Sequence, residues 1–144
     1  MADVVALGEL LVDFVCKETD EIGYPTLVGK PGGAPGNYLA AVKKYGGSCA
    51  MIGKVGEDAL GAGIDLSGVI RAEDCFTTMA FVTLDETGNR HFSFARKPGA
   101  DICLRSDEVN EALIRDCRVF HFGTLSMTDD PAREATRYAI RLAK

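Results

Sequence analysis

The side chains best suited to bind a ligand that carries several hydroxyl groups lie in three short segments of this 144-residue sequence. The first segment, Gly8 to Asp13, places Asp13 directly after three apolar residues, in a region expected to be a strand. A carboxylate in such a region needs hydrogen-bond donors, and ligand hydroxyls are suitable donors. The alternative is that Asp13 lies at the end of a strand and pairs with the backbone of a turn. Asp13 is therefore a candidate binding residue.

The second segment is rich in glycine and runs from Gly29 to Asn37. Adjacent Gly32 and Gly33 allow a ligand to contact the backbone where a Cβ atom would block it. Asn37 can both donate a hydrogen bond to a hydroxyl and accept one from it. The segment is not a P-loop, because proline follows its Gly-Lys pair, and it does not match G-x-G-x-x-G. The alternative is a tight strand-to-helix turn with a capping asparagine.

The third segment contains Arg96 and, five residues later, Asp101. Arg96 can reach a hydroxyl or a phosphorylated product, and Asp101 can orient it. The alternative is a charge on an exposed loop. The two histidines, His91 and His121, are expected to be residues of a sheet, and no Ser, His and Asp set forms a recognisable triad. No residue is therefore assigned as catalytic.

The five cysteines are odd in number and scattered, without a C-x-x-C pair and without a histidine near any cysteine pair. This pattern favours reduced thiols in a cytoplasmic protein over disulfides or zinc, and no metal site is assigned. The first residues lack the basic and apolar regions of a signal peptide. No run approaches the roughly 18 to 20 apolar residues that span a bilayer.

The composition is that of a globular domain, with 47% hydrophobic residues and a net charge of −5. Nucleic acid and anionic membranes select for clustered Lys and Arg, which this sequence lacks. We therefore expect neither as the main partner. A small sugar or polyol is compatible with this charge.

Short apolar runs alternate with segments of helical spacing, which predicts an α/β layered fold. Buried strands are predicted over Val4–Leu7, Cys49–Gly53 and Val119–Phe122. Helices are predicted over residues 38–45, over residues 106–115 with Ser106 as the cap, and from residue 132 onward after a start at Asp129 to Pro131. The sequence stops inside this last helix, which indicates a fragment.

A second group of strands is predicted around residues 10–28 and 77–96. Asp85 to Asn89 is a strong hairpin signal between two strand candidates, and Phe92 and Phe94 alternate with other residues in the second of them. We expect these strands to form a small lid sheet apart from the main sheet. Its partly apolar outer face could pair with a second subunit, which predicts a homodimer through the lid.

Five motifs occur in order along the sequence: G-E-L-L-V-D-F at residues 8–14, K-P-G-G-A-P-G-N at 30–37, I-G-K-V-G-E-D-A-L-G at 52–61, F-V-T-L-D with R-H-F-S-F within 81–94, and V-F-H-F-G-T-L-S-M at 119–127. Taken together, and in this order over nearly the whole chain, they resemble the motifs of the ribokinase-like (PfkB) sugar kinases. The last two motifs are most similar to those of the fructokinases of that family.

The resemblance implies a Rossmann-like ribokinase fold, of which residues 1–144 are the amino-terminal part with the lid. It implies that Asp13, Gly32, Gly33 and Asn37 hold a sugar, with Arg96 at the rim beside the lid. It also implies ATP and Mg²⁺ as cofactors, and transfer of the γ-phosphoryl group to a sugar hydroxyl, with fructose as the expected sugar. The alternatives are a ribose, nucleoside or 2-keto-3-deoxygluconate kinase, and a non-catalytic sugar-binding module.

The sequence departs from the family in two ways. The G-A-G-D motif, with the catalytic base and the anion hole, and the nucleotide site are absent, so these 144 residues alone are predicted to be inactive. In the family a helix of two to three turns separates the position of Gly61 from a G-I/V-D element. Here the matching element, within Ala62 to Asp65, follows Gly61 at once, so the sequence lacks the residues of that helix.

Overall fold

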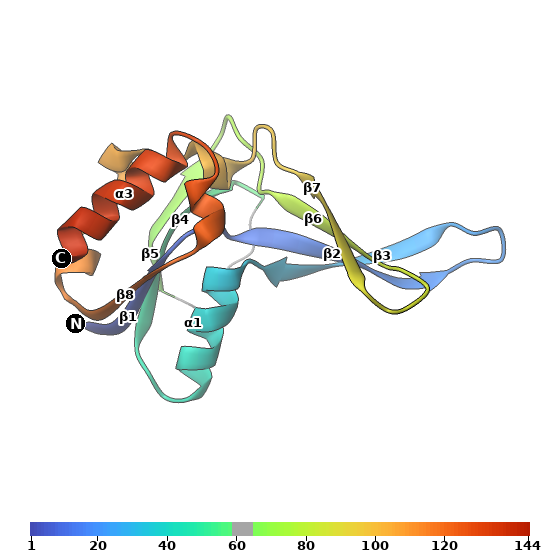
Figure 1. Ribbon diagram of the computed structural model, residues 1–144, viewed down its shortest axis with the longest axis horizontal. Helices are drawn as coiled ribbons and strands as arrows, with labels where there is room; N and C mark the ends of the chain where they lie inside the picture. Colours follow the sequence, from blue (N-terminus) through green and yellow to red (C-terminus); the bar gives the residue numbers. More distant parts are fainter. Residues whose placement is uncertain (59–64) are drawn as a thin grey trace.

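The computed structural model describes residues 1–58 and 65–144, which form two four-stranded sheets with helices against one of them (Figure 1). The strands are β1 (Ala2–Leu7), β2 (Leu11–Thr19), β3 (Pro25–Gly32), β4 (Cys49–Gly56), β5 (Asp65–Ala72), β6 (Met79–Leu84), β7 (Arg90–Ala95) and β8 (Cys117–Phe122). The α-helices are α1 (Ala34–Lys44), α2 (Glu111–Arg115) and α3 (Ala132–Ala143), and the 3₁₀ helices are η1 (Ala100–Cys103), η2 (Ser106–Glu108) and η3 (Thr124–Met127).

The main sheet has the strand order β5-β4-β1-β8, and all neighbouring strands are parallel. Helices cover both of its faces, so its central strands are apolar runs rather than alternating ones. Val4 and Ala6 of β1 pack with Leu39 of α1 on one face. Val5 and Leu7 pack on the other face with a cluster that includes residues of α2 and α3. The core therefore has two layers, one on each side of β1 and β4.

The second sheet has the order β3-β2-β6-β7, in which β2 is antiparallel to β3 and parallel to β6, and β7 is antiparallel to β6. It extends away from the helices (Figure 1). Phe92 and Phe94 of β7 are 51% and 49% exposed, so they lie outside the main core. The prediction of a small sheet apart from the main sheet is confirmed.

The helix boundaries differ from the sequence prediction in three places. Helix α1 begins at Ala34 rather than at residue 38, because Pro35 suits the first turn of a helix and Gly33 supplies the N-cap. Ser106 begins only a 3₁₀ turn, and Asn110 caps the separate helix α2 by accepting a hydrogen bond from the Leu113 amide at 3.3 Å. Helix α3 follows Pro131 without a side-chain cap from Asp129.

Strand β3 is longer than predicted, and strand β5 was not predicted. The first part of the glycine-rich segment, through Gly32, belongs to β3 rather than to a loop. Strand β5 pairs in parallel with β4 at the edge of the main sheet, and the sequence pattern did not indicate it. The proposed loss of a helix after Gly61 falls on residues 59–64, outside the described residues. No helix of the described residues is long and apolar enough to cross a membrane.

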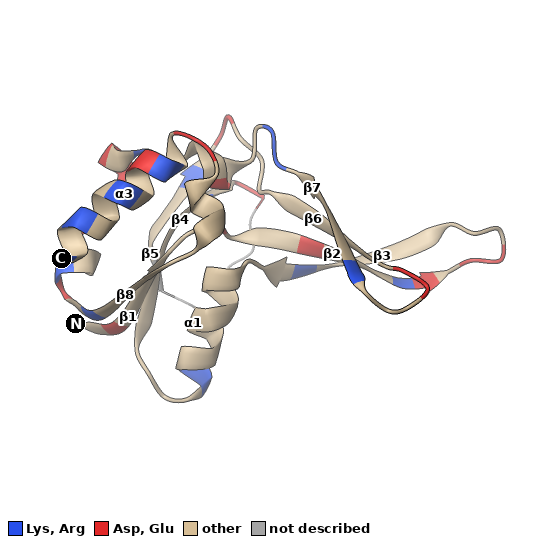
Figure 2. Cartoon of the chain, viewed as in Figure 1, with Lys and Arg blue, Asp and Glu red and all other residues tan. Residues whose placement is uncertain are grey.

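Charged side chains lie mainly on α3 and on the outer turns, with both signs interspersed (Figure 2). On α3 Arg133 pairs with Asp130 and Arg137 pairs with Glu134 at 3.0 Å, each acid lying three residues earlier. These exposed pairs contribute little to stability, about 0 to 1 kcal/mol each. They keep the outer face of α3 hydrated.

Candidate functional site

A hollow of about 920 Å³ lies along one face of the second sheet and reaches the first turn of α1. One end is polar and is lined by Glu9, Asp13, Gly33 and Asn37. The other end is mainly apolar and is lined by Val15, Leu27, Val82, Leu84, Phe92 and Phe94, together with Thr83 and Arg90. The hollow therefore joins a set of hydrogen-bonding groups to an apolar sheet surface.

Asp13 lies on β2, in register with Lys30 of β3 and Ala80 of β6. A Cβ atom at Gly32 would lie 2.1 Å from Asp13 Oδ2, so only glycine leaves room for this carboxylate. Partial burial raises the pKa of Asp13 above its usual value. Because no donor among the described residues pairs with it, Asp13 has hydrogen-bonding capacity left for a ligand. The alternative of a turn-capping aspartate is not what the structure shows.

Gly33 and Asn37 come from the entry of α1. Gly33 has φ 105°, a left-handed conformation, and a Cβ atom there would lie 2.4 Å from the carbonyl oxygen of Glu9. The backbone amide of Asn37 donates to the Gly33 carbonyl at 3.0 Å, which places the exposed Asn37 side chain one turn inside the helix. Asn37 is thus not a capping residue, and its amide group is available at the polar end of the hollow.

Arg96 is placed differently from the other predicted site residues. Its guanidinium donates to Asp101 Oδ2 from Nε at 2.9 Å and from Nη2 at 2.6 Å, and further to the Leu125 carbonyl and Thr128 Oγ1, both at 3.1 Å. Asp101 also accepts a hydrogen bond from Thr78. The Arg96 side chain is 13% exposed, so it is not a free loop charge. It touches the hollow only through Leu125, which lines it.

The structure therefore brings together Asp13, Gly33 and Asn37, with Gly32 directly behind the Asp13 carboxylate. Sequence reasoning missed Glu9, which is 4% exposed and lines the same end of the hollow. Its Oε1 accepts a hydrogen bond from the Ala34 amide at 3.1 Å. The available signal was position: Glu9 follows the carboxyl end of β1, and ligands of parallel α/β sheets bind at that edge.

The described residues hold no cluster of three or more His, Cys, Asp and Glu side chains suited to a metal ion. Mg²⁺ prefers carboxylates and substrate phosphates at near-octahedral geometry. The described part of this chain does not offer that set, so we assign it no step that involves Mg²⁺.

The parallel main sheet, the second sheet and the hollow between it and α1 can be compared with known proteins. Residues 1–144 match the family profile described as pfkB family carbohydrate kinase. The chain therefore belongs to the pfkB family of carbohydrate kinases.

Similar proteins within this family include plant and bacterial fructokinases. Fructokinase-1 of Zea mays is 40% identical over 152 residues, which cover 98% of this chain and 47% of that protein. Fructokinase-2 of Oryza sativa is 40% identical and is matched over 45% of its length. The crystal structure of fructokinase with bound ATP from Xylella fastidiosa superposes with a TM-score of 0.87 at 31% identity, covering 99% of this chain and 49% of that one. The chain thus spans about half the length of these relatives.

Proposed function

We propose that this chain is the sugar-binding half of an ATP-dependent sugar kinase and that its substrate is fructose. The observation that carries the proposal is the Asp13 carboxylate, which lines the hollow and has no donor among the described residues. The fructokinase names of relatives at about 40% identity support fructose. The ATP bound by the Xylella fastidiosa enzyme supports ATP as the phosphoryl donor.

In this proposal the sugar occupies the polar end of the hollow. Asp13 accepts hydrogen bonds from its hydroxyls, because a carboxylate is an acceptor at both oxygens. Asn37 donates or accepts at a neighbouring hydroxyl. Gly32 leaves room for the Asp13 carboxylate and Gly33 leaves room for the Glu9 carbonyl, so the two glycines shape this end of the hollow. The second sheet acts as the lid that shields these contacts from water.

Arg96 remains a prediction as a sugar contact. Its four hydrogen bonds to protein atoms favour a positioning role, in which it holds the Leu125 carbonyl of η3 at the edge of the hollow. When bound, MgATP supplies the phosphoryl group, and the catalytic base and phosphate-binding groups belong to a part of the kinase beyond these 144 residues. The chain's own contribution is to bind and orient the accepting hydroxyl.

The decisive experiment is a calorimetric titration of the full-length kinase that carries this chain with fructose, comparing wild type with Asp13→Asn. A hydrogen bond to a charged group contributes about 1.5 to 3 kcal/mol, so the Kd should rise about 10- to 140-fold. The matched control is Asp107→Asn, an exposed aspartate on η2 that does not line the hollow. An Asp13→Asn protein that binds fructose as tightly as wild type would overturn the assignment of this site.

The alternatives are separated by two further measurements. Competing ribose, nucleosides and 2-keto-3-deoxygluconate against fructose in the same titration identifies the sugar. A polypeptide of residues 1–144 should release no ADP when fructose and MgATP are supplied. Turnover within a hundredfold of the usual kinase range of about 1 to 100 per second would show that the catalytic residues lie within this chain.

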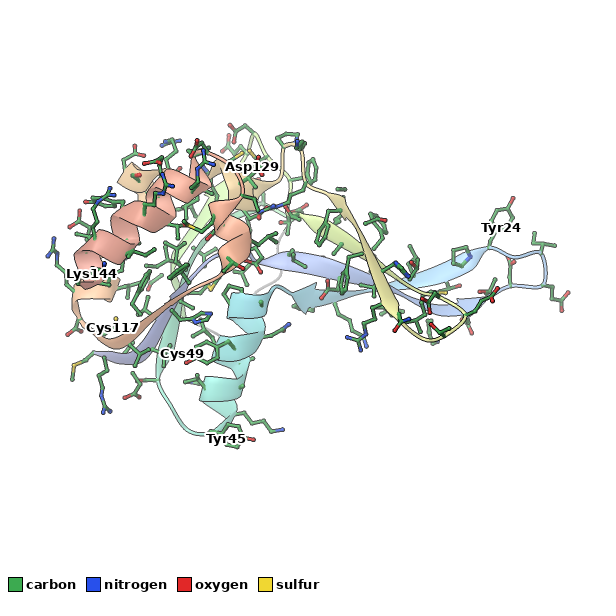
Figure 3. The ribbon with its side chains drawn as sticks, in the orientation of Figure 1. Tyr24, Tyr45, Cys49, Cys117, Asp129 and Lys144 are labelled. Carbon is green, nitrogen blue, oxygen red and sulfur yellow. The ribbon has the colours of Figure 1, made fainter. Side chains whose placement is uncertain are left out.

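We further propose that the apolar end of the hollow is covered by the second sheet of another copy of the chain. Leu84, Phe92 and Phe94 are 65%, 51% and 49% exposed and line this end together. Tyr24, 69% exposed at the far tip of the same sheet, extends the exposed apolar surface (Figure 3). Large exposed apolar surfaces of this kind mark interaction sites.

A further inference from the structure

Glu9 has an unusual hydrogen-bonding state. Its side chain is buried, yet its Oε2 atom is the one buried side-chain nitrogen or oxygen of the described residues that has no hydrogen-bond partner. Leaving a buried polar group without a partner costs about 1 to 3 kcal/mol, and more for a charged group. Such a group in a native structure calls for a partner that comes from outside the chain.

The location of Glu9 indicates where that partner comes from. Glu9 lies where three segments meet: the carboxyl end of β1, the amino end of α1 through its bond to Ala34, and the turn after β8 at Gly123. A Cβ atom at Gly123 would lie 2.7 Å from Glu9 Oε2, so only glycine leaves space for this oxygen. Glu9 also lines the polar end of the hollow.

The surroundings of Glu9 disfavour its charge. Burial raises its pKa above the usual value, the Ala34 hydrogen bond and Arg96 oppose this, and Asp101 adds to it. A hydrogen-bond donor placed against the carboxylate would offset the cost of burial. The Ala34 amide bonds to Oε1 and the backbone N–H of Glu9 also stabilises the carboxylate, yet Oε2 has no partner, which leaves this oxygen for a donor on the ligand.

We propose that Glu9 is a second sugar-binding carboxylate, whose unpartnered oxygen accepts a hydrogen bond from one hydroxyl of the sugar held by Asp13. The last torsion of a glutamate side chain is broad, so a modest rotation of the carboxyl group shares its two oxygens between the Ala34 amide and the ligand. This inference rests on the proposed function, because it assigns a second contact in the same site.

The experiment compares wild type and Glu9→Gln in the full-length kinase by titration with fructose and with its 1-, 3-, 4- and 6-deoxy analogues. Glutamine keeps an oxygen for the Ala34 amide but replaces the unpartnered oxygen with a donor. The fructose Kd should rise at least tenfold. One deoxy analogue should bind both proteins with about equal affinity, because the hydroxyl that Glu9 accepts from is already missing. The other analogues should lose the same factor as fructose.

Two results would overturn the proposal: an unchanged fructose Kd for Glu9→Gln, or an equal loss for every analogue, which is the signature of a merely structural role. A wild type that binds no fructose would instead refute the proposed function itself. A fructose Kd raised by Asp13→Asn but not by Glu9→Gln would refute only the role of Glu9.

A second variant covers the case in which Glu9→Gln does not fold. Gly123→Ala keeps the carboxylate but places a methyl group 2.7 Å from both Glu9 Oε2 and Pro35 Cγ, so its fold is checked first by circular dichroism. It should reproduce the loss for fructose and the equal binding of the same single analogue. Wild-type affinity for all five sugars in a folded Gly123→Ala protein would count against the proposal.

Discussion

The main sheet and the second sheet are built to opposite requirements. Every residue of β4 is buried, whereas all but the last residue of β3 and nearly all of β7 are exposed. Helices lie against the main sheet, while the second sheet extends beyond them (Figure 1). The main sheet thus supplies most of the buried core, whereas the second sheet leaves most of its side chains exposed, as the proposed contacts with a sugar and a second copy require.

The largest expected effect is on the free energy of unfolding, when leucine is replaced by alanine once in each sheet. Leu7→Ala in β1 removes a fully buried side chain and should lower the free energy of unfolding by about 3 to 5 kcal/mol. Leu84→Ala in β6 removes a side chain that is 65% exposed and should cost less than about 1 kcal/mol. Denaturant unfolding of the purified protein measures both values. Equal losses would show that the second sheet is as much a part of the core as the first.

Replacing a buried arginine and an exposed one tests the junction between the sheets. Arg96→Met leaves the 1% exposed Asp101 side chain without its cation and should lower the free energy of unfolding by about 3 kcal/mol or more. Arg118→Met breaks the exposed pair with Asp3 and should cost about 0 to 1 kcal/mol. The same unfolding measurements decide the comparison, and a harmless Arg96→Met would place the junction among the exposed ion pairs.

A smaller effect on stability and a clear effect on assembly are expected at the surface of the second sheet. Phe94→Ser should change the free energy of unfolding of one copy by less than about 1 kcal/mol, yet weaken self-association at least tenfold. The control is Tyr45→Ser. Tyr45 directly follows α1 and is 87% exposed, and its substitution should leave association unchanged (Figure 3). Sedimentation equilibrium measures the association constants. A Phe94→Ser protein that associates like wild type would remove the proposed contact between copies.

The smallest effect is a dependence of stability on pH that comes from Glu9. Because burial raises its pKa, the folded chain binds this proton more tightly than the unfolded chain does. Its favourable contribution is complete below the usual value of 4.5 and is lost as pH rises through the raised pKa. The stability of wild type minus that of Glu9→Gln should therefore fall with rising pH above about 4.5 and then level off. A difference that rises over this range would have the wrong sign.

The sequence predicts the buried strands well because their apolar runs have one physical explanation. Val4 to Leu7 and Cys49 to Gly53 are strands where expected, and the hairpin at Asp85 to Asn89 is confirmed. The glycine-rich segment misleads because glycine is read as a breaker, whereas Pro35 starts α1 directly after Gly33. Strand β5 contains Ser67 and Gly68, so it lacks a continuous apolar run.

The candidate site was predictable only in part. Asp13, Gly33 and Asn37 are each unusual in their local sequence, and the structure brings them to one hollow. The role of Arg96 depends on partners 29 and 32 residues away, at Leu125 and Thr128, which local patterns do not specify. Glu9 was missed because its burial follows from the packing of β1, α1 and the turn at Gly123, and not from its neighbours in sequence.

The path of the chain between the two sheets has a mechanical consequence. Within the described residues the chain crosses between them four times, through residues 8–10, Gly33, residues 73–78 and residues 96–99. Any rigid swing of the second sheet must bend all four connectors together, which restricts it to a narrow set of axes. Two of these connectors carry Glu9 and Gly33 at the polar end of the hollow. A displacement of the far tip of the second sheet would therefore shift Glu9 and Gly33 at the polar end of the hollow.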